Sequence, residues 1–274
     1  MKALVFSAGG AFGAYEAGAW TAIEERGFRP AIVVGASIGA LNAAAVARGC
    51  TGKRLQDLWR DPKANVFRWN WPPRSLGLLD QALLAARIGE LLVEFPQAGE
   101  GVKLLITMTA LPSTRVRVVS GEQVTARSLL ASCAVPLAYA PVKVEGRWYC
   151  DGGVFCPLPL QAAAEAGASE IVGVDLLAAP PSALAHSMMT AAIRVRRWAL
   201  GEPDGMAAPE GVRLLRIVPR APLGRLRDIL RWSPENVDRW IEAGYRDAAA
   251  AWERESQARA AQETSPRADR TAPA

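Results

Sequence analysis

The first fifty residues contain two short apolar runs, and each of them leads directly into a glycine-containing turn. The run ALVF enters SAGGAFG, and the β-branched run AIVV enters GASIG. Both turns are followed by segments with the apolar spacing of a helix, which stop at Gly27 and Gly49. Strands that alternate with helices in this way predict an α/β fold, with a mostly parallel sheet covered by helices on both faces.

The same alternation continues along the chain. Further strands are predicted at VKLLITMTAL, TRVRVVS, EIVGVDL and VRLLRIV, and a hairpin at PVKVEGRWYC. Further helices are predicted at residues 80–94, at ARSLLASCA and PLQAAAEAG, at residues 191–200 and from Ser233 onwards. Residues 62–78, which contain Trp69 and Trp71, predict a surface loop or lid. We expect one domain over residues 1–252 and a polar, disordered tail over residues 253–274.

The composition narrows the setting in which the chain works. No stretch approaches the roughly 18 consecutive apolar residues that a membrane-spanning helix needs, and the start MKALVFSAGG has no secretory signal pattern. The four cysteines lack C-x-x-C spacing, which argues against a zinc site and against a disulfide framework. We therefore expect a cytoplasmic protein. Its net charge of +5 favours anionic partners, which include nucleic acid and anionic lipid surfaces.

A nucleophilic serine is predicted in the second turn. The segment Gly35-Ala36-Ser37-Ile38-Gly39 fits the G-x-S-x-G nucleophile elbow, in which a strained turn between a strand and a helix exposes a serine hydroxyl. A simple tight glycine turn is the alternative. The flanking segments AIVV and ALNAAAVAR supply the strand and helix that the motif requires, so we predict that Ser37 is a nucleophile.

Hydrogen-bond donors for an oxyanion are predicted in the first turn. Backbone N–H groups serve best where no side chain blocks their approach, and Gly9, Gly10 and Ala11 meet that need. One alternative is that these residues and Gly13 only permit a tight turn. Another is dinucleotide binding, since AGGAFG partly matches G-x-G-x-x-G, but Ala8 stands where that motif has its first glycine.

The general base is predicted to be an aspartate. The only histidine, His186, lies in SALAHSMMTAAI, where nothing marks it as a catalytic base. Asp151 is followed by Gly152 and Gly153, and a carboxylate held by a rigid turn can take a proton from a serine. An isolated Asp-Gly-Gly is more often an ordinary turn. Its occurrence together with the other two turns favours the catalytic interpretation.

Three segments together resemble the patatin-like phospholipase family: LVFSAGGAFGAYEAG, VVGASIGALNAA and ASCAVPLAYAPVKVEGRWYCDGGVFCPLPL. The resemblance implies a three-layer α/β/α fold. It also implies a Ser37–Asp151 dyad that hydrolyses lipid acyl esters through an acyl-enzyme, with Asp151 as the base in both half-reactions. No metal or organic cofactor is expected. The expected partner is a lipid or another acyl ester, and nucleic acid is not expected.

Two residues depart from the pattern that the family loop usually has, Gly-Gly-Gly-x-Arg/Lys-Gly. Ala8 replaces the first glycine, and Phe12 replaces the basic residue. Since Gly9 and Gly10 remain, we expect Ala8 to be tolerated. Phe12 removes a cation near the loop, which bears on the efficiency of catalysis and on any preference for anionic head groups.

An apolar channel for acyl chains is predicted beside the catalytic residues. Phe67, Trp69, Trp71 and the helix LLAARIGELLVEF could form its walls, although ordinary packing would explain them as well. Contact with an anionic membrane surface is predicted through several arginines: Arg194, Arg196, Arg197, Arg220, Arg225, Arg227 and Arg231. Two other functions stay open: a carboxylesterase or thioesterase for soluble acyl compounds, and a non-catalytic lipid-binding protein that keeps the fold.

Overall fold

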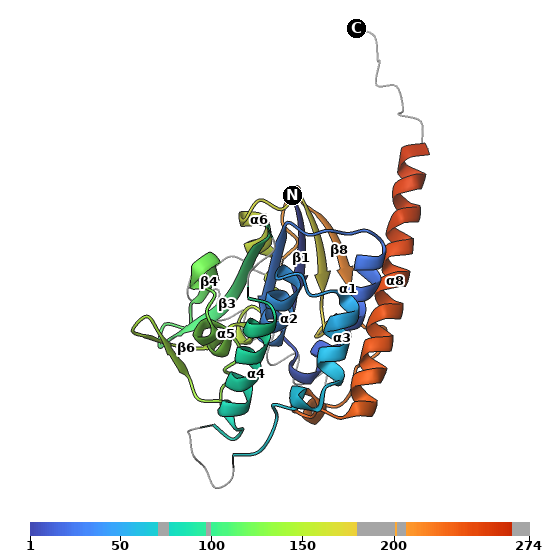
Figure 1. Ribbon diagram of the computed structural model, residues 1–274. Helices are drawn as coiled ribbons and strands as arrows, with labels where there is room; N and C mark the ends of the chain where they lie inside the picture. The colour runs from blue at the N-terminus through green and yellow to red at the C-terminus, as the bar shows by residue number, and fades with distance from the viewer. Residues whose placement is uncertain (71–76, 97–99, 180–200, 202–206, 265–274) are drawn as a thin grey trace.

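One mixed sheet forms the centre of the molecule. The computed structural model describes residues 1–70, 77–96, 100–179, 201 and 207–264 (Figure 1). Within them the sheet has eight strands in the order β5-β6-β3-β2-β1-β7-β8, with β4 also pairing with β3. The strands are β1 (Lys2–Phe6), β2 (Ile32–Ala36), β3 (Lys103–Leu111), β4 (Val116–Ser120), β5 (Val142–Val144), β6 (Arg147–Asp151), β7 (Glu170–Val174) and β8 (Arg213–Ile217).

The central part of the sheet is parallel, as the alternation of strands and helices predicts. β1 pairs with β2 and β7, β2 pairs with β3, and β7 pairs with β8, all in parallel. β4 and β6 both pair antiparallel with β3, and β5 and β6 form the predicted hairpin. Because parallel strands present their carboxyl ends at one edge, the turns after β1 and β2 lie next to each other.

The side chains of the strands divide the interior into two cores. Leu4 and Phe6 of β1 point into the larger core, whereas Ala3 and Val5 point into the smaller one on the opposite face. This alternation follows from the two-residue period of a strand. Burial on both faces explains why the central strands read as nearly continuous apolar runs.

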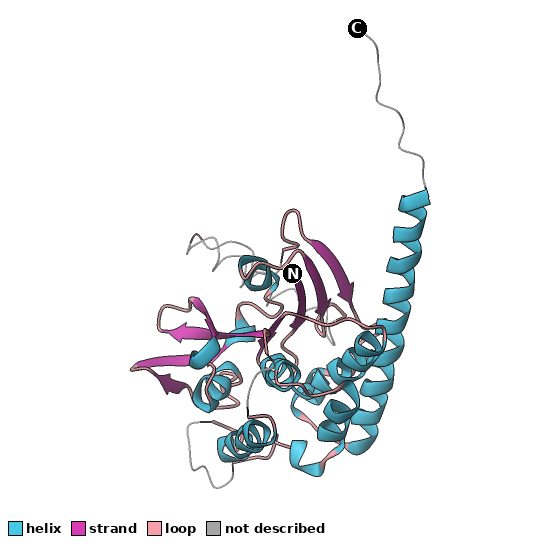
Figure 2. Cartoon of the chain, turned by 45° about the horizontal axis from the view of Figure 1, so that its top comes forward, coloured by secondary structure: helices cyan, strands magenta, loops and turns pink. Residues whose placement is uncertain are grey.

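Helices cover both faces and give the expected three layers (Figure 2). The α-helices are α1 (Gly13–Glu25), α2 (Ile38–Ala47), α3 (Gly52–Arg60), α4 (Gln81–Glu94), α5 (Ala126–Ser132), α6 (Leu160–Glu165) and α8 (Pro234–Thr264). The 3-10 helices are η1 (Gly10–Phe12), η2 (Pro62–Ala64), η3 (Gly121–Gln123), η4 (Gly152–Val154) and η5 (Leu226–Leu230). Side chains of α1, α2, α3 and α8 fill the larger core, and those of α6 fill the smaller one. The helix predicted at residues 191–200 lies outside the described residues.

The last helix is longer than the sequence indicated. α8 continues to Thr264, so the prediction of a disordered tail from residue 253 is wrong for residues 253–264; residues 265–274 lie outside the described part. Arg259 explains the extension, because it contacts Glu255 one turn earlier at 3.0 Å and Glu170 at the start of β7 at 3.0 Å. Alanine, arginine and glutamate are also strong helix formers, which supports a helix in this polar segment.

The helix α3 was not predicted. Its N-cap residue Thr51 accepts a hydrogen bond from the amide of Arg54 at 3.2 Å, and its side chains Leu55, Leu58 and Trp59 are buried. A capping threonine followed by apolar residues at helical spacing is a signal that the sequence carried. The short length of this segment and its charged residues obscured that signal.

Candidate active site

Ser37 lies in the turn between β2 and α2. Its backbone has φ 55° and ψ −127°, an unfavourable conformation for a residue with a side chain. Gly35 and Gly39 make this turn feasible, because a Cβ on Gly35 would collide with the Gly39 carbonyl and one on Gly39 would lie 2.5 Å from the Ser7 carbonyl oxygen. The glycines of the G-x-S-x-G segment therefore have a steric role in bringing α2 close to β1.

Two residues at the end of α5, Ser132 and Cys133, form hydrogen bonds with the backbone of Ser37. The Ser37 amide donates to the hydroxyl of Ser132 at 3.2 Å, and the Cys133 thiol donates to the Ser37 carbonyl at 3.1 Å. Both partners lie at the end of α5 and are buried. They were not singled out from the sequence, because serine and cysteine in ASCAVP carry no local signal of a contact with residue 37.

Asp151 is the last residue of β6 and is almost completely buried. Its amide donates to the Ala134 carbonyl at 3.0 Å, and its carbonyl accepts from the hydroxyl of Thr109 at 2.9 Å. Its Oδ1 accepts from the Gly153 amide at 2.7 Å. The backbone on both sides and one carboxyl oxygen are thus fixed, so the direction of the second oxygen is fixed too.

The second carboxyl oxygen of Asp151 is the unusual feature of this site. Among the described residues Oδ2 is buried and has no hydrogen-bond partner of ordinary geometry. Burial raises the pKa of Asp151 to about 7. Contacts from the Ser37 side chain and from the amides of Gly153 and Val154 act in the opposite direction, because they favour the charged form. The Ser37 side chain therefore lies close enough to the carboxyl group to favour its charged form.

The glycine loop after β1 lies against the same space. Gly10 and Ala11 are the first residues of η1, so their N–H groups have no partner within that helix. Gly9 and Gly10 line the pocket that contains Ser37 and Asp151, but Ala11 is fully buried and does not belong to the lining. The loop has no room for side chains, because a Cβ on Gly10 would meet the backbone of Ile229.

A pocket of about 300 Å³ joins these residues. Its polar lining includes Ser37 and Asp151, and most of the rest is apolar. The apolar lining comes from Ala8, Ile38, Val66, Phe67, Leu84, Val135, Tyr139, Val154, Leu177, Leu226, Ile229 and Leu230. Such a lining fits a ligand that combines an apolar chain with a reactive polar group.

The predicted channel residues divide between this pocket and the surface. Of the side chains predicted as channel walls, Phe67 and, from the helix LLAARIGELLVEF, Leu84 line the pocket with Ser37. Trp69 is 74% exposed and lies at an outer hollow of about 550 Å³, which Phe67 and Leu230 also line. Trp71 lies outside the described residues. Phe67, Val135 and Leu230 line both spaces, so the outer hollow adjoins the pocket.

Ala8 and Phe12, which depart from the family pattern, both pack closely. A Cβ on Gly153 would collide with the Ala8 side chain, so the loop after β1 and the turn after Asp151 are in contact. Phe12 is buried and packs edge-on against Trp240 of α8, with ring centroids 5.0 Å apart. In place of a cation, the glycine loop therefore has an apolar anchor on the last helix.

A buried polar network beneath the loop was missed from the sequence. The amide nitrogen of Asn42 donates to Glu16 Oε2 at 2.8 Å and to the Gly13 carbonyl at 3.0 Å, and its oxygen accepts from the Trp59 indole at 3.0 Å. Burial raises the pKa of Glu16 well above its usual range, and the hydrogen bond from Asn42 opposes that shift. The network joins the starts of α1 and α2, which carry the two glycine turns.

Some predicted residues cannot be placed. His186, the alternative base, lies outside the described residues, and so do Arg194, Arg196 and Arg197. In the ranges that the structure does describe, no three His, Cys, Asp or Glu side chains are grouped so that they could hold a metal ion. Within those same ranges, no helix is both long enough and apolar enough to cross a membrane.

Comparisons with known proteins place the chain in a family. The pattern of the family described as patatin-like phospholipase matches residues 4–164. An uncharacterized protein of Bacillus subtilis, YqhO, is 29% identical over 203 residues, which are 63% of this chain and 70% of YqhO. An uncharacterized NTE family protein of Mycobacterium tuberculosis is 30% identical over 184 residues, which are 64% of this chain and 48% of that protein.

A solved structure supports the fold. VipD from Legionella pneumophila aligns with 92% of this chain and 67% of its own chain, with a TM-score of 0.51 and 16% sequence identity. At this identity the likeness concerns the arrangement of helices and strands. The chain spans about half the length of the mycobacterial relative, so it corresponds to only part of that protein.

Proposed function

Because the chain belongs to the patatin-like phospholipase family, a family of lipid hydrolases, we propose that it cleaves lipid esters through an acyl-enzyme on Ser37. The observation that carries this proposal is the shared pocket of Ser37, Asp151, Gly9 and Gly10. A strained serine, a buried carboxyl group and two glycines without side chains meet in an otherwise apolar space. Ester hydrolysis needs a nucleophile, a base and oxyanion donors in such proximity.

In the first half-reaction Ser37 Oγ attacks the carbonyl carbon of the ester, and its proton passes to the carboxylate of Asp151. The carbonyl oxygen becomes an oxyanion, which the amides of Gly9 and Gly10 stabilise. When the tetrahedral intermediate collapses, the alcohol leaves with the proton from Asp151. In the second half-reaction Asp151 takes a proton from water, which attacks the acyl-enzyme. When this second tetrahedral intermediate collapses, Asp151 gives the proton to Ser37 Oγ, and the acid leaves.

The environment of Asp151 supports a catalytic role over a purely structural one. A buried carboxyl oxygen without a hydrogen-bond partner costs folding free energy, of the order of 1–3 kcal/mol. A residue with only a packing role would not need a buried carboxyl oxygen that lacks a hydrogen-bond partner. A base with a pKa of about 7 is half deprotonated at neutral pH and still basic enough to accept the serine proton.

Lipid esters fit the site better than soluble acyl compounds because exposed apolar side chains line the pocket and the adjoining hollow. We define the apolar rim as five exposed side chains that line the pocket or the outer hollow: Trp69, Leu78, Leu137, Leu226 and Leu230. Arg227 and Arg231 line the same hollow. Apolar side chains interleaved with arginines suit an anionic lipid surface, so peripheral contact with such a surface is part of the proposal.

Labelling with a fluorophosphonate, together with hydrolysis of an ester series, tests the catalytic assignment. We expect Ser37→Ala to abolish both labelling and turnover, and Asp151→Asn to lower kcat/KM by roughly 10²- to 10⁴-fold. The variant His186→Ala serves as the control and should keep most of the activity. Equal labelling of wild type and Ser37→Ala would leave a non-catalytic lipid-binding protein as the better description. Loss of activity in His186→Ala with retention in Asp151→Asn would make histidine the base.

A further inference from the structure

A second cavity lies directly behind the pocket of Ser37. It has a volume of about 60 Å³ and lies among α2, α3, α4 and the segment at residues 64–66. Three residues line both this rear cavity and the pocket: Ile38, Val66 and Leu84. Since each of them faces both spaces, the two cavities are separated by a wall one side chain thick. We call these three residues the partition.

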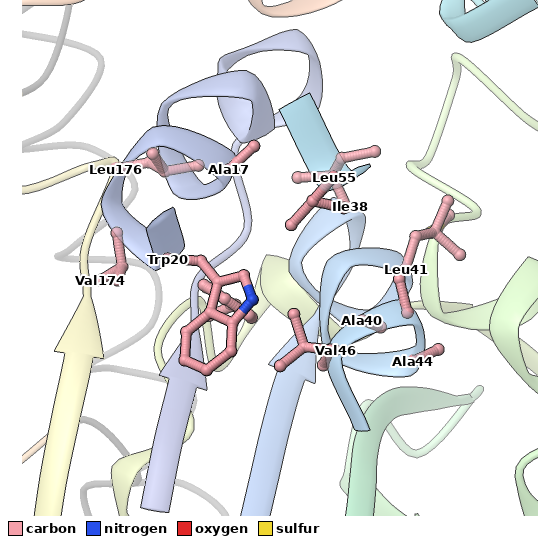
Figure 3. Packing of buried hydrophobic residues seen from close by; sticks show 14 of the residues in the cluster. Ala17, Trp20, Ile38, Ala40, Leu41, Ala44, Val46, Leu55, Val174 and Leu176 are labelled. Carbon is pink, nitrogen blue, oxygen red and sulfur yellow. The ribbon is translucent and has the colours of Figure 1, made fainter. Parts of the chain in front are cut away.

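The rear cavity is suited to a hydrocarbon chain. Apart from the partition, its lining is mostly apolar: Leu41, Leu55, Leu58, Trp59, Ala64 and Leu91. Figure 3 shows Ile38 and Leu55 side by side, with Leu41 on the same helix as Ile38. Burial of methylene groups against such walls is favourable, whereas a polar ligand would find few hydrogen-bond partners there.

The polar groups at the edge of the rear cavity are already paired. Arg87 donates to the Leu58 carbonyl at 2.9 Å, and Glu94 accepts from Arg54 at 2.6 Å. Asn42 is engaged with Glu16, Gly13 and Trp59, as described above. Since these hydrogen bonds engage the polar groups of the lining, a chain in the cavity would meet mainly carbon atoms.

Leu84 is the member of the partition with the least direct connection to the proposed catalytic groups. Ile38 follows Ser37 directly in the strained turn, so its position is tied to the nucleophile. The backbone of Val66 is held by a hydrogen bond from the Tyr139 hydroxyl at 3.1 Å. Leu84 comes from α4, which carries none of the proposed catalytic groups, and its side chain is almost fully buried at the wall.

We propose that Leu84 ends the acyl-binding site and sets the length of the acyl chain that the enzyme accepts, with the rear cavity as the space into which a longer chain would extend if this side chain were smaller. The role of the chain as an acyl group rests on the proposed function. With the partition closed, the end of the acyl chain meets Leu84, and longer chains must bend or remain outside. Removing the Leu84 side chain joins the two spaces and admits the additional methylenes.

Replacing Leu84 tests this proposal through a ratio of two activities. We expect Leu84→Ala to raise the ratio of kcat/KM for a dodecanoate ester to that for a butyrate ester by roughly ten-fold. About two additional methylenes would become buried, and each is worth about four-fold. Val66→Ala opens the same wall from its other side and should shift the ratio in the same direction, even if Leu84→Ala folds poorly.

Leu91→Ala is the matched control, because Leu91 lines the rear cavity only. It enlarges that cavity by a comparable amount and leaves the partition closed, so the ratio should stay at the wild-type value. An unchanged ratio in both Leu84→Ala and Val66→Ala would overturn the proposal. An equal shift in Leu91→Ala would also overturn it, since general loosening of α4 would then explain the result.

Binding of free fatty acids of increasing length separates this proposal from the proposed function. Calorimetry on proteins that carry Ser37→Ala measures chain length without turnover, and Leu84→Ala should shift the tightest binding to longer acids. If wild type lacks Ser37-dependent hydrolysis but this shift occurs, the catalytic proposal fails and the role of Leu84 stands. If hydrolysis depends on Ser37 but neither ratio nor binding shifts, the role of Leu84 is wrong.

Discussion

The carboxyl group of Asp151 experiences two opposing effects. Burial raises its pKa, while the Ser37 side chain and the amides of Gly153 and Val154 lower it, and the balance lies at about 7. In an unfolded chain an aspartate has a pKa of about 4. The stability that the protonated form contributes is therefore fully present below pH ~4 and is lost as the pH rises through about 7.

The first prediction at the residue scale concerns the pH dependence of activity. A general base must be deprotonated, so kcat/KM should rise with pH, reach half its maximum near pH 7 and level off above it. The measurement is a pH profile with an uncharged ester. The residual activity of Asp151→Asn should lack this rise. A profile that falls between acidic and neutral pH would contradict the assignment of Asp151 as the base.

The same pKa predicts that the variant Asp151→Asn gains stability. Asp151→Asn removes the cost of a buried charge, so above pH 7 it should be more stable than wild type by a few kcal/mol. Urea unfolding at acidic and alkaline pH measures the difference. Near pH 4 the two proteins should be alike, because the wild-type carboxyl group is then neutral. Equal stability at alkaline pH would mean that the carboxylate is well solvated.

At the scale of elements, the contact between α1 and α8 positions the glycine loop. A Cβ on Gly244 of α8 would collide with the Tyr15 carbonyl, and one on Gly18 of α1 would collide with the Ile241 carbonyl. These two glycines let the helix backbones touch. One helical turn before Gly244, Trp240 packs on Phe12 of η1, so the last helix supports the loop that we propose as the source of the oxyanion donors.

Separating these two helices should affect both stability and catalysis. We expect Gly244→Leu to lower the free energy of unfolding by about 2–3 kcal/mol, because the new side chain forces α8 away from α1. The shift of Trp240 should also lower kcat on an ester. Gly89→Ala is the control, since a Cβ at Gly89 in α4 meets nothing within 4 Å. It should raise stability by roughly 0.5–1 kcal/mol and leave kcat unchanged. Unaltered kcat in a folded Gly244→Leu protein would show that α8 does not position the loop.

At the scale of the whole molecule, the side chains of the apolar rim lie together in one region of the surface. Leu137 is 82% exposed and Trp69 is 74% exposed, and both lie at the outer hollow that continues from the pocket. Arg227 and Arg231 lie beside them. A patch that combines apolar and basic side chains around a pocket mouth is typical of a surface that meets lipid.

Sedimentation with lipid vesicles tests this surface. Trp69→Ser and Leu137→Ser, combined, should weaken binding to anionic vesicles by roughly ten-fold or more, since two large apolar side chains no longer enter the interface. Hydrolysis of a soluble butyrate ester should not change. Val93→Ser is the control, because Val93 of α4 is 82% exposed and lines neither the pocket nor the outer hollow. Equal loss in the control, or wild-type binding in the double variant, would count against the surface.

Much of the fold follows from local signals. The run ALVF before SAGGAFG and the run AIVV before GASIG predict β1, β2 and the helices that follow them, because periodicity and glycine turns are properties of neighbouring residues. The hairpin at Glu145-Gly146 has the same origin. The helix α3 and the extension of α8 were missed, since Leu55 and Arg259 gain their stabilising contacts from partners distant in the sequence.

The sequence by itself determined which chemical groups stand in the three turns, including the serine, the aspartate and the glycines that leave the backbone open. Only the tertiary structure decided how these groups are surrounded: a buried oxygen on Asp151, a network of Glu16, Asn42 and Trp59 under the loop, and a partition that ends the pocket. The reason is physical. Turn geometry depends on adjacent residues, whereas desolvation, pKa and cavity shape depend on side chains that come together only when distant segments pack.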